Sequence, residues 1–248
     1  MQKLLTTFLF SLFVFTTISC IFILSGNSSS YIENIHETKK VDYTDLSYVA
    51  FGDSITYGID GINGNRMSNP YPDLVADELN LKSVINNAVS GAVFCSNTLD
   101  RKNMTQIILN FKGDADIISV LLGVNDKFLS LPLGTTACRD NSTIYGSLHL
   151  ICDYLIENYS DSFIFFMTPF KYEDYDLLND EGYVLKDVAN AINWVCGKYN
   201  IPVLDMYNLG NYEVEMYLEE SDGIHPSQEF VRKYTAPQIV KFIRNNYI

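Results

Sequence analysis

Residues 116–122 have the sequence DIISVLL, a short run whose apolar side chains would point to both faces of a strand. Strands that are apolar on both faces are typical of parallel sheets covered by helices on each side. Four further short runs bounded by turn residues predict strands at Ser47–Phe51, Ser83–Asn87, Phe163–Met167 and Pro202–Asp205. The sequence therefore predicts five strands.

Apolar residues at helical spacing occupy the segments between these strands. They predict helices at Pro70–Leu79, Asn97–Phe111, Thr143–Tyr159, Val184–Tyr199 and Ser227–Asn246. We expect Asn69 to cap the first helix and the last to begin or bend near Pro237. Strands alternating with amphipathic helices predict one α/β domain, whose ligands should bind at the carboxyl ends of the strands.

The composition excludes several classes of protein. Of the 248 residues, 47% are hydrophobic and 19% are charged, so the chain can form a sizeable core and is not disordered throughout. The formal net charge is −13, which would repel nucleic-acid phosphates. Neither a nucleotide-binding glycine loop nor a zinc-protease or EF-hand pattern is present. The sequence indicates no nucleic-acid partner and no cofactor.

The N-terminal segment, residues 1–26, is expected to direct export and to remain as a membrane anchor or be cleaved. Leu4–Leu24 holds no charged side chain, and as a helix it would be about 31 Å long, close to the thickness of a bilayer core. Its length favours an anchor, whereas its six hydroxyl residues favour cleavage. Residues 27–43 form a polar linker, and residues 44–248 are expected to form the domain outside the cytoplasm.

Residues 17–20, with the sequence TISC, resemble a bacterial lipoprotein box. Thr17 replaces the usual branched apolar residue of that motif, and the residues after Cys20 remain apolar. Lipid attachment is therefore less favoured than an anchor or simple secretion.

The remaining cysteines leave disulfide bonding open. They are Cys95, Cys138, Cys152 and Cys196, an even number in an exported domain. Their pairing cannot be deduced from spacing. Cys152 and Cys196 fall on apolar helix faces, where buried free thiols are the simpler expectation.

Polar groups capable of catalysis follow the predicted strands. Gly52-Asp53-Ser54, Ser90-Gly91 and Gly123-Val124-Asn125-Asp126 come directly after the first three strands, and Asp222-Gly223-Ile224-His225-Pro226 precedes the last helix. Each group alone has the simpler explanation of a turn. Together, and in this order, they favour one site at one edge of the sheet.

These residue types match acyl transfer by a serine. Ser54 is a weak nucleophile without a base, and His225 can be that base. Asp222 can orient the imidazole and stabilise its charged form. The backbone N–H groups of Ser54 and Gly91 and the side-chain amide of Asn125 can stabilise an oxyanion.

The same four groups resemble the sequence blocks of the SGNH/GDSL hydrolase family. The order and spacing also match, over about residues 47–245, and the sequence FGDSIT at 51–56 differs from the name-giving motif only by Ile55 in place of Leu. The resemblance implies a three-layer α/β/α, flavodoxin-like fold with a five-stranded parallel sheet, and ester hydrolysis. It also implies Ser54 as nucleophile, His225 and Asp222 as base and orienter, and Ser54, Gly91 and Asn125 as oxyanion donors.

Other polar residues are ambiguous. Tyr172 and Tyr175 lie in the acidic segment YEDYDLLNDE, which is either a solvated loop or a wall of the substrate pocket. We expect Asp53 to hold the serine loop and Asp126 to support the site indirectly. His149 is expected to be solvated or structurally satisfied rather than catalytic.

The expected activity is that of an extracytoplasmic serine esterase acting on small acyl esters. Exported relatives often remove O-acetyl groups from polysaccharides, so acetylated carbohydrate is the first expected substrate. A lipase, lysophospholipase or thioesterase acting on longer acyl chains is the alternative. A further alternative is a catalytically silent carbohydrate-binding module on the same fold, but such a module would be expected to have lost a site residue. Acyl transfer to a sugar and the oligomeric state stay open.

Overall fold

A five-stranded parallel sheet forms the centre of the domain in a computed structural model of the chain, with the strand order β2-β1-β3-β4-β5. The strands are β1 (Ser47–Gly52), β2 (Ser83–Asn86), β3 (Ile117–Leu121), β4 (Phe163–Met167) and β5 (Val203–Leu204). All neighbouring pairs are parallel. Every residue of β3 is buried, as its two apolar faces predicted. The expected five-stranded α/β fold is confirmed.

The structure describes residues 41–96, 102–209 and 221–247, and the chain from Asp42 onward forms one compact unit. The predicted export segment, the lipoprotein-like box and most of the linker lie outside these residues. None of the helices in the described ranges is long and apolar enough to cross a membrane.

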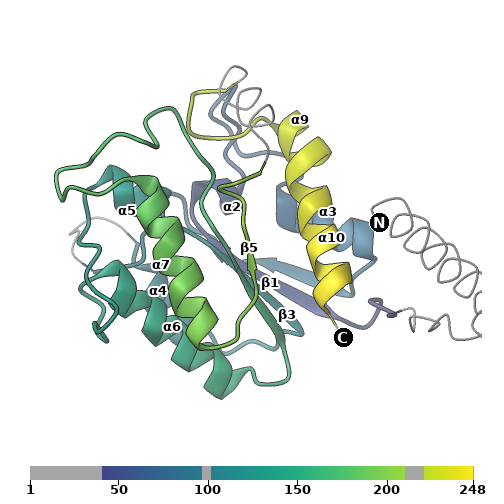
Figure 1. The fold of residues 1–248 in the computed structure, drawn as a ribbon. Coiled ribbons are helices and arrows are strands. Elements are labelled where there is room, and N and C mark those ends of the chain that lie inside the picture. The colour runs from purple at the N-terminus through teal and green to yellow at the C-terminus, as the bar shows by residue number, and fades with distance from the viewer. Residues whose placement is uncertain (1–40, 97–101, 210–220, 248) are drawn as a thin grey trace, which may run out of the picture. The chain divides into compact units, whose positions relative to one another are not determined.

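Helices cover both faces of the sheet (Figure 1). On one face lie α3 (Tyr71–Leu79) and α10 (Ala236–Asn246), whose apolar side chains share one core cluster. On the other face α4 (Met104–Leu109), α6 (Ile144–Asn158) and α7 (Leu185–Lys198) share a second cluster. The sheet separates the two clusters, so the domain has three layers.

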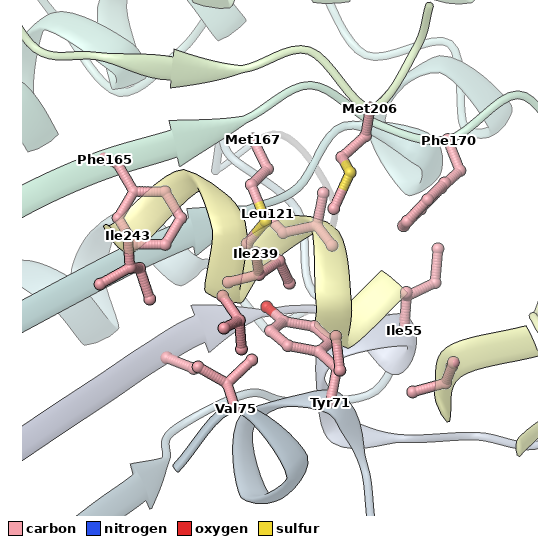
Figure 2. Close-up of a cluster of buried hydrophobic side chains, with 14 of the residues drawn as sticks. Ile55, Tyr71, Val75, Leu121, Phe165, Met167, Phe170, Met206, Ile239 and Ile243 are labelled. Atoms are coloured by element: carbon pink, nitrogen blue, oxygen red, sulfur yellow. The ribbon is translucent and has the colours of Figure 1, made fainter. Parts of the chain in front are cut away.

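The core beneath α10 is built from large apolar side chains of the sheet and of the α3–α10 layer (Figure 2). Ile239 and Ile243 of α10 face Phe165 and Met167 of β4, and Tyr71 and Val75 of α3 lie beside them. All six side chains are fully buried. This packing fixes α10 against the sheet, and α10 follows the segment that carries His225.

Helix starts agree only in part with the sequence. Thr143 caps α6, where its side chain accepts a hydrogen bond from the Gly146 N–H. Asn103 caps α4, where its side chain accepts a hydrogen bond from the Gln106 N–H. The cap predicted at Asn69 is wrong, because Pro70 occupies the cap position of α3 without a side-chain hydrogen bond. The helix predicted from Asn97 is shorter in the described residues and begins at Met104.

The predicted last helix is divided into three parts. They are α9 (Gln228–Phe230), the π-helical turn η1 (Val231–Thr235) and α10. Pro237 lies in the first turn of α10, directly after the π-helical turn η1, so its missing N–H falls where the helical hydrogen-bond pattern changes. The expectation that the helix begins near Pro237 is therefore confirmed.

Two short helices were not predicted. They are α2 (Ser54–Tyr57) and α5 (Val124–Phe128), and each begins directly after a buried strand. Both are too short to show a helical pattern of apolar residues. They matter because they begin at two of the four sequence blocks predicted to hold catalytic groups.

The four cysteines in the described part of the chain, Cys95, Cys138, Cys152 and Cys196, are free thiols. Cys152 of α6 and Cys196 of α7 are fully buried, as expected from their apolar helix faces. Their thiols lie within hydrogen-bonding reach across the α6–α7 contact, and this contact raises the pKa of Cys152.

Replacing Ile239 should show how strongly the α10 layer stabilises the domain. Ile239→Ala removes a fully buried side chain and should lower the free energy of unfolding by about 2–5 kcal/mol. Ile156→Ala, on the partly exposed face of α6, is the matched control and should cost about 1 kcal/mol or less. Urea denaturation of both variants measures the difference, and equal losses would contradict the packing described above.

Candidate active site

The turn between β1 and α2 places Ser54, which is 7% exposed, at the carboxyl edge of the sheet. A side chain at Gly52 would collide with Thr56 Oγ1 and lie 2.8 Å from the carbonyl oxygen of Leu121, so only glycine fits there. Asp53 caps α2, and its Oδ1 accepts a hydrogen bond from the Ile55 N–H at 2.9 Å. The expectation that Asp53 holds the serine loop by hydrogen bonding is confirmed.

Ser54, His225 and Asp222 form a continuous hydrogen-bonded chain. The Oγ of Ser54 lies 2.8 Å from Nε2 of His225, and Nδ1 of His225 lies 2.8 Å from Oδ2 of Asp222. A neutral histidine that donates its Nδ1–H to the carboxylate leaves Nε2 free to accept the serine proton. The three residues therefore have the geometry of a nucleophile, a base and an orienting group.

The turn that contains Asp222 also fixes the conformation of its carboxylate. Oδ1 of Asp222 accepts hydrogen bonds from the backbone N–H groups of Ile224, at 3.0 Å, and His225, at 2.7 Å. Burial acts to raise the pKa of Asp222, but the hydrogen bonds from His225 and Ile224 outweigh it, and the pKa lies below its usual value. Asp222 is therefore ionised at neutral pH and stabilises a positive charge on His225.

The two other predicted oxyanion donors lie on the segments that follow β2 and β3, the strands on either side of β1. Gly91, with φ +78°, follows β2, and the Val89 N–H donates to the carbonyl oxygen of Gly52 at 3.0 Å. Asn125 lies in α5 directly after β3, and its Nδ2 donates to the carbonyl oxygen of Ala92 at 3.0 Å. An amide NH₂ has two donors, so one N–H of Asn125 is left for a ligand.

Two buried carboxyl groups lie behind this edge of the sheet. Burial raises the pKa of Asp53 to about 6, although the Ile55 N–H and the charge of His225 act against it. Burial raises the pKa of Asp126 to about 7, against the hydrogen bond from Phe94 and with a further contribution from the charge of Asp53. Oδ1 of Asp126 accepts the Phe94 N–H at 2.9 Å, which ties the Gly91 segment to α5. The indirect supporting role expected for Asp126 agrees with this contact.

A family model and solved structures supply an independent comparison. The model of the GDSL-like lipase/acylhydrolase family matches residues 50–233, which include Ser54, Gly91, Asn125, Asp222 and His225. The chain belongs to the GDSL-like lipase/acylhydrolase family. A search of curated proteins found no match.

Solved structures of this family and of similar proteins share the fold. A protein from Lactobacillus plantarum is 24% identical with a TM-score of 0.70, over 82% of this chain and 99% of that one. A lipase/acylhydrolase from Enterococcus faecalis is 20% identical with a TM-score of 0.56, over 81% and 96%. A carbohydrate acetylesterase family member from Sinorhizobium meliloti is 16% identical with a TM-score of 0.56, over 81% and 98%. These likenesses support the GDSL hydrolase fold.

The two predicted pocket tyrosines lie on the loop after β4, at the same edge as the GDSL serine. Tyr172 is 3% exposed and packs in the core cluster shared with α10. Tyr175 is half-buried, with its ring 6.1 Å from the ring of Tyr207. Neither has a hydrogen bond to Ser54 or His225 within the described ranges, so their contact with substrate stays a prediction.

Lys127 contacts the loop that carries Tyr172, a link that the sequence did not indicate. Its Nζ donates to the carbonyl oxygen of Asp174 at 2.6 Å and lies 5.1 Å from the centre of the Tyr172 ring. Burial lowers the pKa of this amine. Lys127 thus ties the loop after β4 to α5, two residues beyond Asn125. A single buried lysine gives no sequence signal.

Gly61 is a second residue that the sequence analysis missed. The Gly61 N–H donates to the carbonyl oxygen of Pro226 at 3.1 Å. A Cβ at Gly61 would collide with the carbonyl oxygen of His225 and lie 2.6 Å from Cβ of Ser221. The loop after α2 therefore packs directly against the backbone of the catalytic histidine. Its glycine and asparagine residues predict only a turn.

Within the described ranges, no group of three or more His, Cys, Asp or Glu side chains is arranged to hold a metal ion. The buried His149 donates or accepts at Nδ1 with the hydroxyl of Tyr199 at 3.0 Å, which agrees with its expected structural role.

Gly61→Ala should slow catalysis by displacing His225. The added methyl group has no room beside the His225 carbonyl, so the histidine must move away from Ser54. Loss of this alignment should lower kcat on the order of 10- to 100-fold. Gly197→Ala on α7, where a Cβ meets nothing within 4 Å, is the matched control and should leave kcat unchanged. Equal activity of the two variants would contradict a positioning role for this loop.

Asp126→Asn should change how stability depends on pH. The pKa of Asp126 is raised from 3.8 to about 7 in the fold, so its contribution to stability is fully present below about pH 3.8 and is lost as the pH rises through 7. Relative to the Asn variant, the wild-type unfolding free energy should fall by about 3–4 kcal/mol between these pH values.

Urea denaturation from pH 4 to pH 8 measures this difference. Asp77→Asn, on the exposed face of α3, is the control for removing one carboxyl. A difference between wild type and Asp126→Asn that does not vary with pH would contradict the raised pKa of Asp126.

Proposed function

We propose that the chain is an extracytoplasmic serine esterase that hydrolyses short acyl esters through an acyl-enzyme on Ser54. The observation that carries this proposal is the hydrogen-bonded chain from Ser54 through His225 to Asp222, at the strand edge where α/β proteins bind ligands. Membership of an acylhydrolase family supports the same reaction class.

The first half of the reaction forms the acyl-enzyme. Oγ of Ser54 attacks the acyl carbon of the ester while its proton passes to Nε2 of His225. The ionised Asp222 stabilises the resulting imidazolium. The carbonyl oxygen becomes an oxyanion, which accepts hydrogen bonds from the Ser54 and Gly91 N–H groups and from Asn125. Collapse of this intermediate breaks the ester bond, and His225 returns the proton to the leaving alcohol.

The second half of the reaction hydrolyses the acyl-enzyme. His225 takes a proton from water, and the hydroxide attacks the acyl carbon attached to Ser54. The same three donors stabilise the second oxyanion. Collapse releases the carboxylic acid and restores the Ser54 hydroxyl with the proton from His225. The reaction needs no redox step and no further acid or base.

We propose acetylated carbohydrate as the first substrate class to assay. The family resemblance supports it, since exported relatives often act on O-acetyl groups, and one similar fold belongs to a carbohydrate acetylesterase family member. The uncharged Leu4–Leu24 segment supports export or membrane attachment, which would bring the domain to surface glycans.

A longer acyl chain is the second candidate, on a specific observation. Phe128 at the end of α5 is 62% exposed, and Leu177 and Leu178 on the loop after β4 are 56% and 71% exposed. Both segments follow strands at the carboxyl edge, and Nδ2 of Asn179 joins the loop to the carbonyl oxygen of Lys127 at 3.1 Å. Exposed apolar side chains there would suit an acyl chain.

Hydrolysis of aryl esters of increasing acyl length tests the proposed activity. The full chain should cleave acetyl and propionyl esters fastest, and Ser54→Ala should lower kcat to the background rate without a large loss of stability. A preference for long acyl chains would favour the second candidate. Undiminished turnover by a folded Ser54→Ala variant would contradict the proposed nucleophile.

Asn125→Ala tests the oxyanion site separately. Loss of one oxyanion donor should lower kcat by about 10²–10³-fold with a smaller change in KM. Asn193→Ala on the exposed face of α7 removes a matched amide and should leave both constants unchanged. Equal kcat values for the two variants would remove Asn125 from the proposed mechanism.

A further inference from the structure

A groove lies between α3 and the segment formed by η1 and α10, outside the catalytic residues. Its volume is about 380 Å³, and none of Ser54, Asp222 and His225 lines it. Apolar side chains such as Leu74 and Val240 form its floor. The groove therefore lies on a helix-covered face of the domain, whereas the active site lies at the edge of the sheet.

The charge of this groove is opposite to that of the protein. The chain has 17 basic and 30 acidic residues, yet the groove is lined by Arg232, Lys241 and Arg244 and by one acid, Glu78. Glu78 pairs with Arg244 at 3.3 Å. Within the described ranges no ion pair engages Arg232 or Lys241. Two cations are thus available to an anionic ligand above an apolar floor.

The chain enters the domain beside the end of this groove. The ring of Tyr43 lies 5.7 Å from the ring of Tyr247, which follows the groove-lining end of α10. Burial raises the pKa of Tyr43, and the charge of Arg244 acts against that rise. If the chain is attached to a surface through the residues before Tyr43, the groove is therefore kept close to that surface.

The sequence indicates what that attachment is. Only 18 residues, Ser25–Asp42, separate the uncharged Leu4–Leu24 segment from Tyr43. A chain of that length can span at most about 60 Å when fully extended. If Leu4–Leu24 is held in a bilayer, the groove is confined near the lipid surface, where even weak binding becomes effective.

We propose that this groove is a docking surface for the anionic phospholipid headgroups of the membrane that holds the N-terminal segment. The inference rests on the membrane attachment included in the proposed function. The guanidinium of Arg232 and the amine of Lys241 donate to phosphate oxygens, and the apolar floor takes the glycerol region of the lipid.

This surface also fits the electrostatics of the whole domain. A net charge of −13 repels an anionic bilayer, so the domain can approach one only with a locally cationic face. Docking through α3 and α10 leaves the carboxyl edge of the sheet open beside the bilayer. A membrane anchor and a cationic surface together give the domain a stable and oriented attachment to the bilayer, whereas a single weak membrane-binding feature does not.

Chemical labelling of Lys241 in the full chain tests the proposal. The chain is incorporated into phosphatidylcholine vesicles, or into the same vesicles containing phosphatidylglycerol, and treated with an amine-reactive reagent. Peptide mass spectrometry then measures labelling at each lysine. Lys241 should react several-fold more slowly with phosphatidylglycerol present. Lys198, exposed on α7 over the Trp194 ring on the opposite face of the sheet, should react equally in both.

Charge-changing variants make the test specific. Arg232→Glu should remove the lipid-dependent protection of Lys241, whereas Lys186→Glu, on α7, should keep it. High salt should weaken the protection, because it screens exposed charges. Equal labelling of Lys241 in the two kinds of vesicle, or protection that survives Arg232→Glu, would overturn the proposal.

Two further outcomes separate this proposal from others. Protection of Lys241 by soluble glycerophosphoglycerol as strong as that by vesicles would overturn docking to a surface in favour of a free phosphate ligand. Failure of the chain to float with either vesicle would overturn both the attachment and the docking surface. Ser54-dependent aryl ester hydrolysis, measured in the same samples, reports the catalytic proposal independently of either result.

Discussion

The hydrogen bond between Ser54 Oγ and His225 Nε2 joins residues that are 171 positions apart in the chain. Such a contact depends on the order of the sheet, which places β1 in a central position and brings the segment before α9 back to its carboxyl edge. The packing of α10 holds that segment from one side, and the Gly61 loop holds it from the other. The apolar layers and the catalytic geometry are therefore parts of one structure.

The same edge of the sheet carries an energetic cost. Asp53 and Asp126 are almost completely buried, and burial raises the pKa of each. Each carboxyl nonetheless holds a backbone N–H in the loop that presents a proposed oxyanion donor. The stability lost by burying two acids is offset by the apolar core, and the gain is a fixed alignment of Ser54 with Gly91 and Asn125.

Much of the fold and the position of the catalytic groups could be predicted from the sequence. Strands such as β3 are apolar on both faces, and the polar groups that follow them must meet at one edge because the strands are parallel. These are local patterns combined with one rule of topology. The SGNH/GDSL resemblance added the expected roles of Ser54, His225 and Asp222.

The remainder depends on contacts between distant segments. Lys127 lies over the ring of Tyr172, 45 positions later in the chain, and Gly61 is restricted by the His225 carbonyl. The cationic groove forms only when α3 packs against η1 and α10, which carry its three cations. None of these features follows from a pattern within a single segment.

Trapping of the acyl-enzyme tests the central claim most directly. The full chain, mixed with an aryl acetate and quenched in acid during turnover, should carry one acetyl group on the peptide that contains Ser54, as seen by mass spectrometry. The release of aryl alcohol should show a burst equal to the enzyme concentration if hydrolysis of the acyl-enzyme is the slower step. An acetyl group found on a residue other than Ser54 in the active enzyme would contradict the account. So would the absence of any acetylated residue when saturating substrate gives a burst.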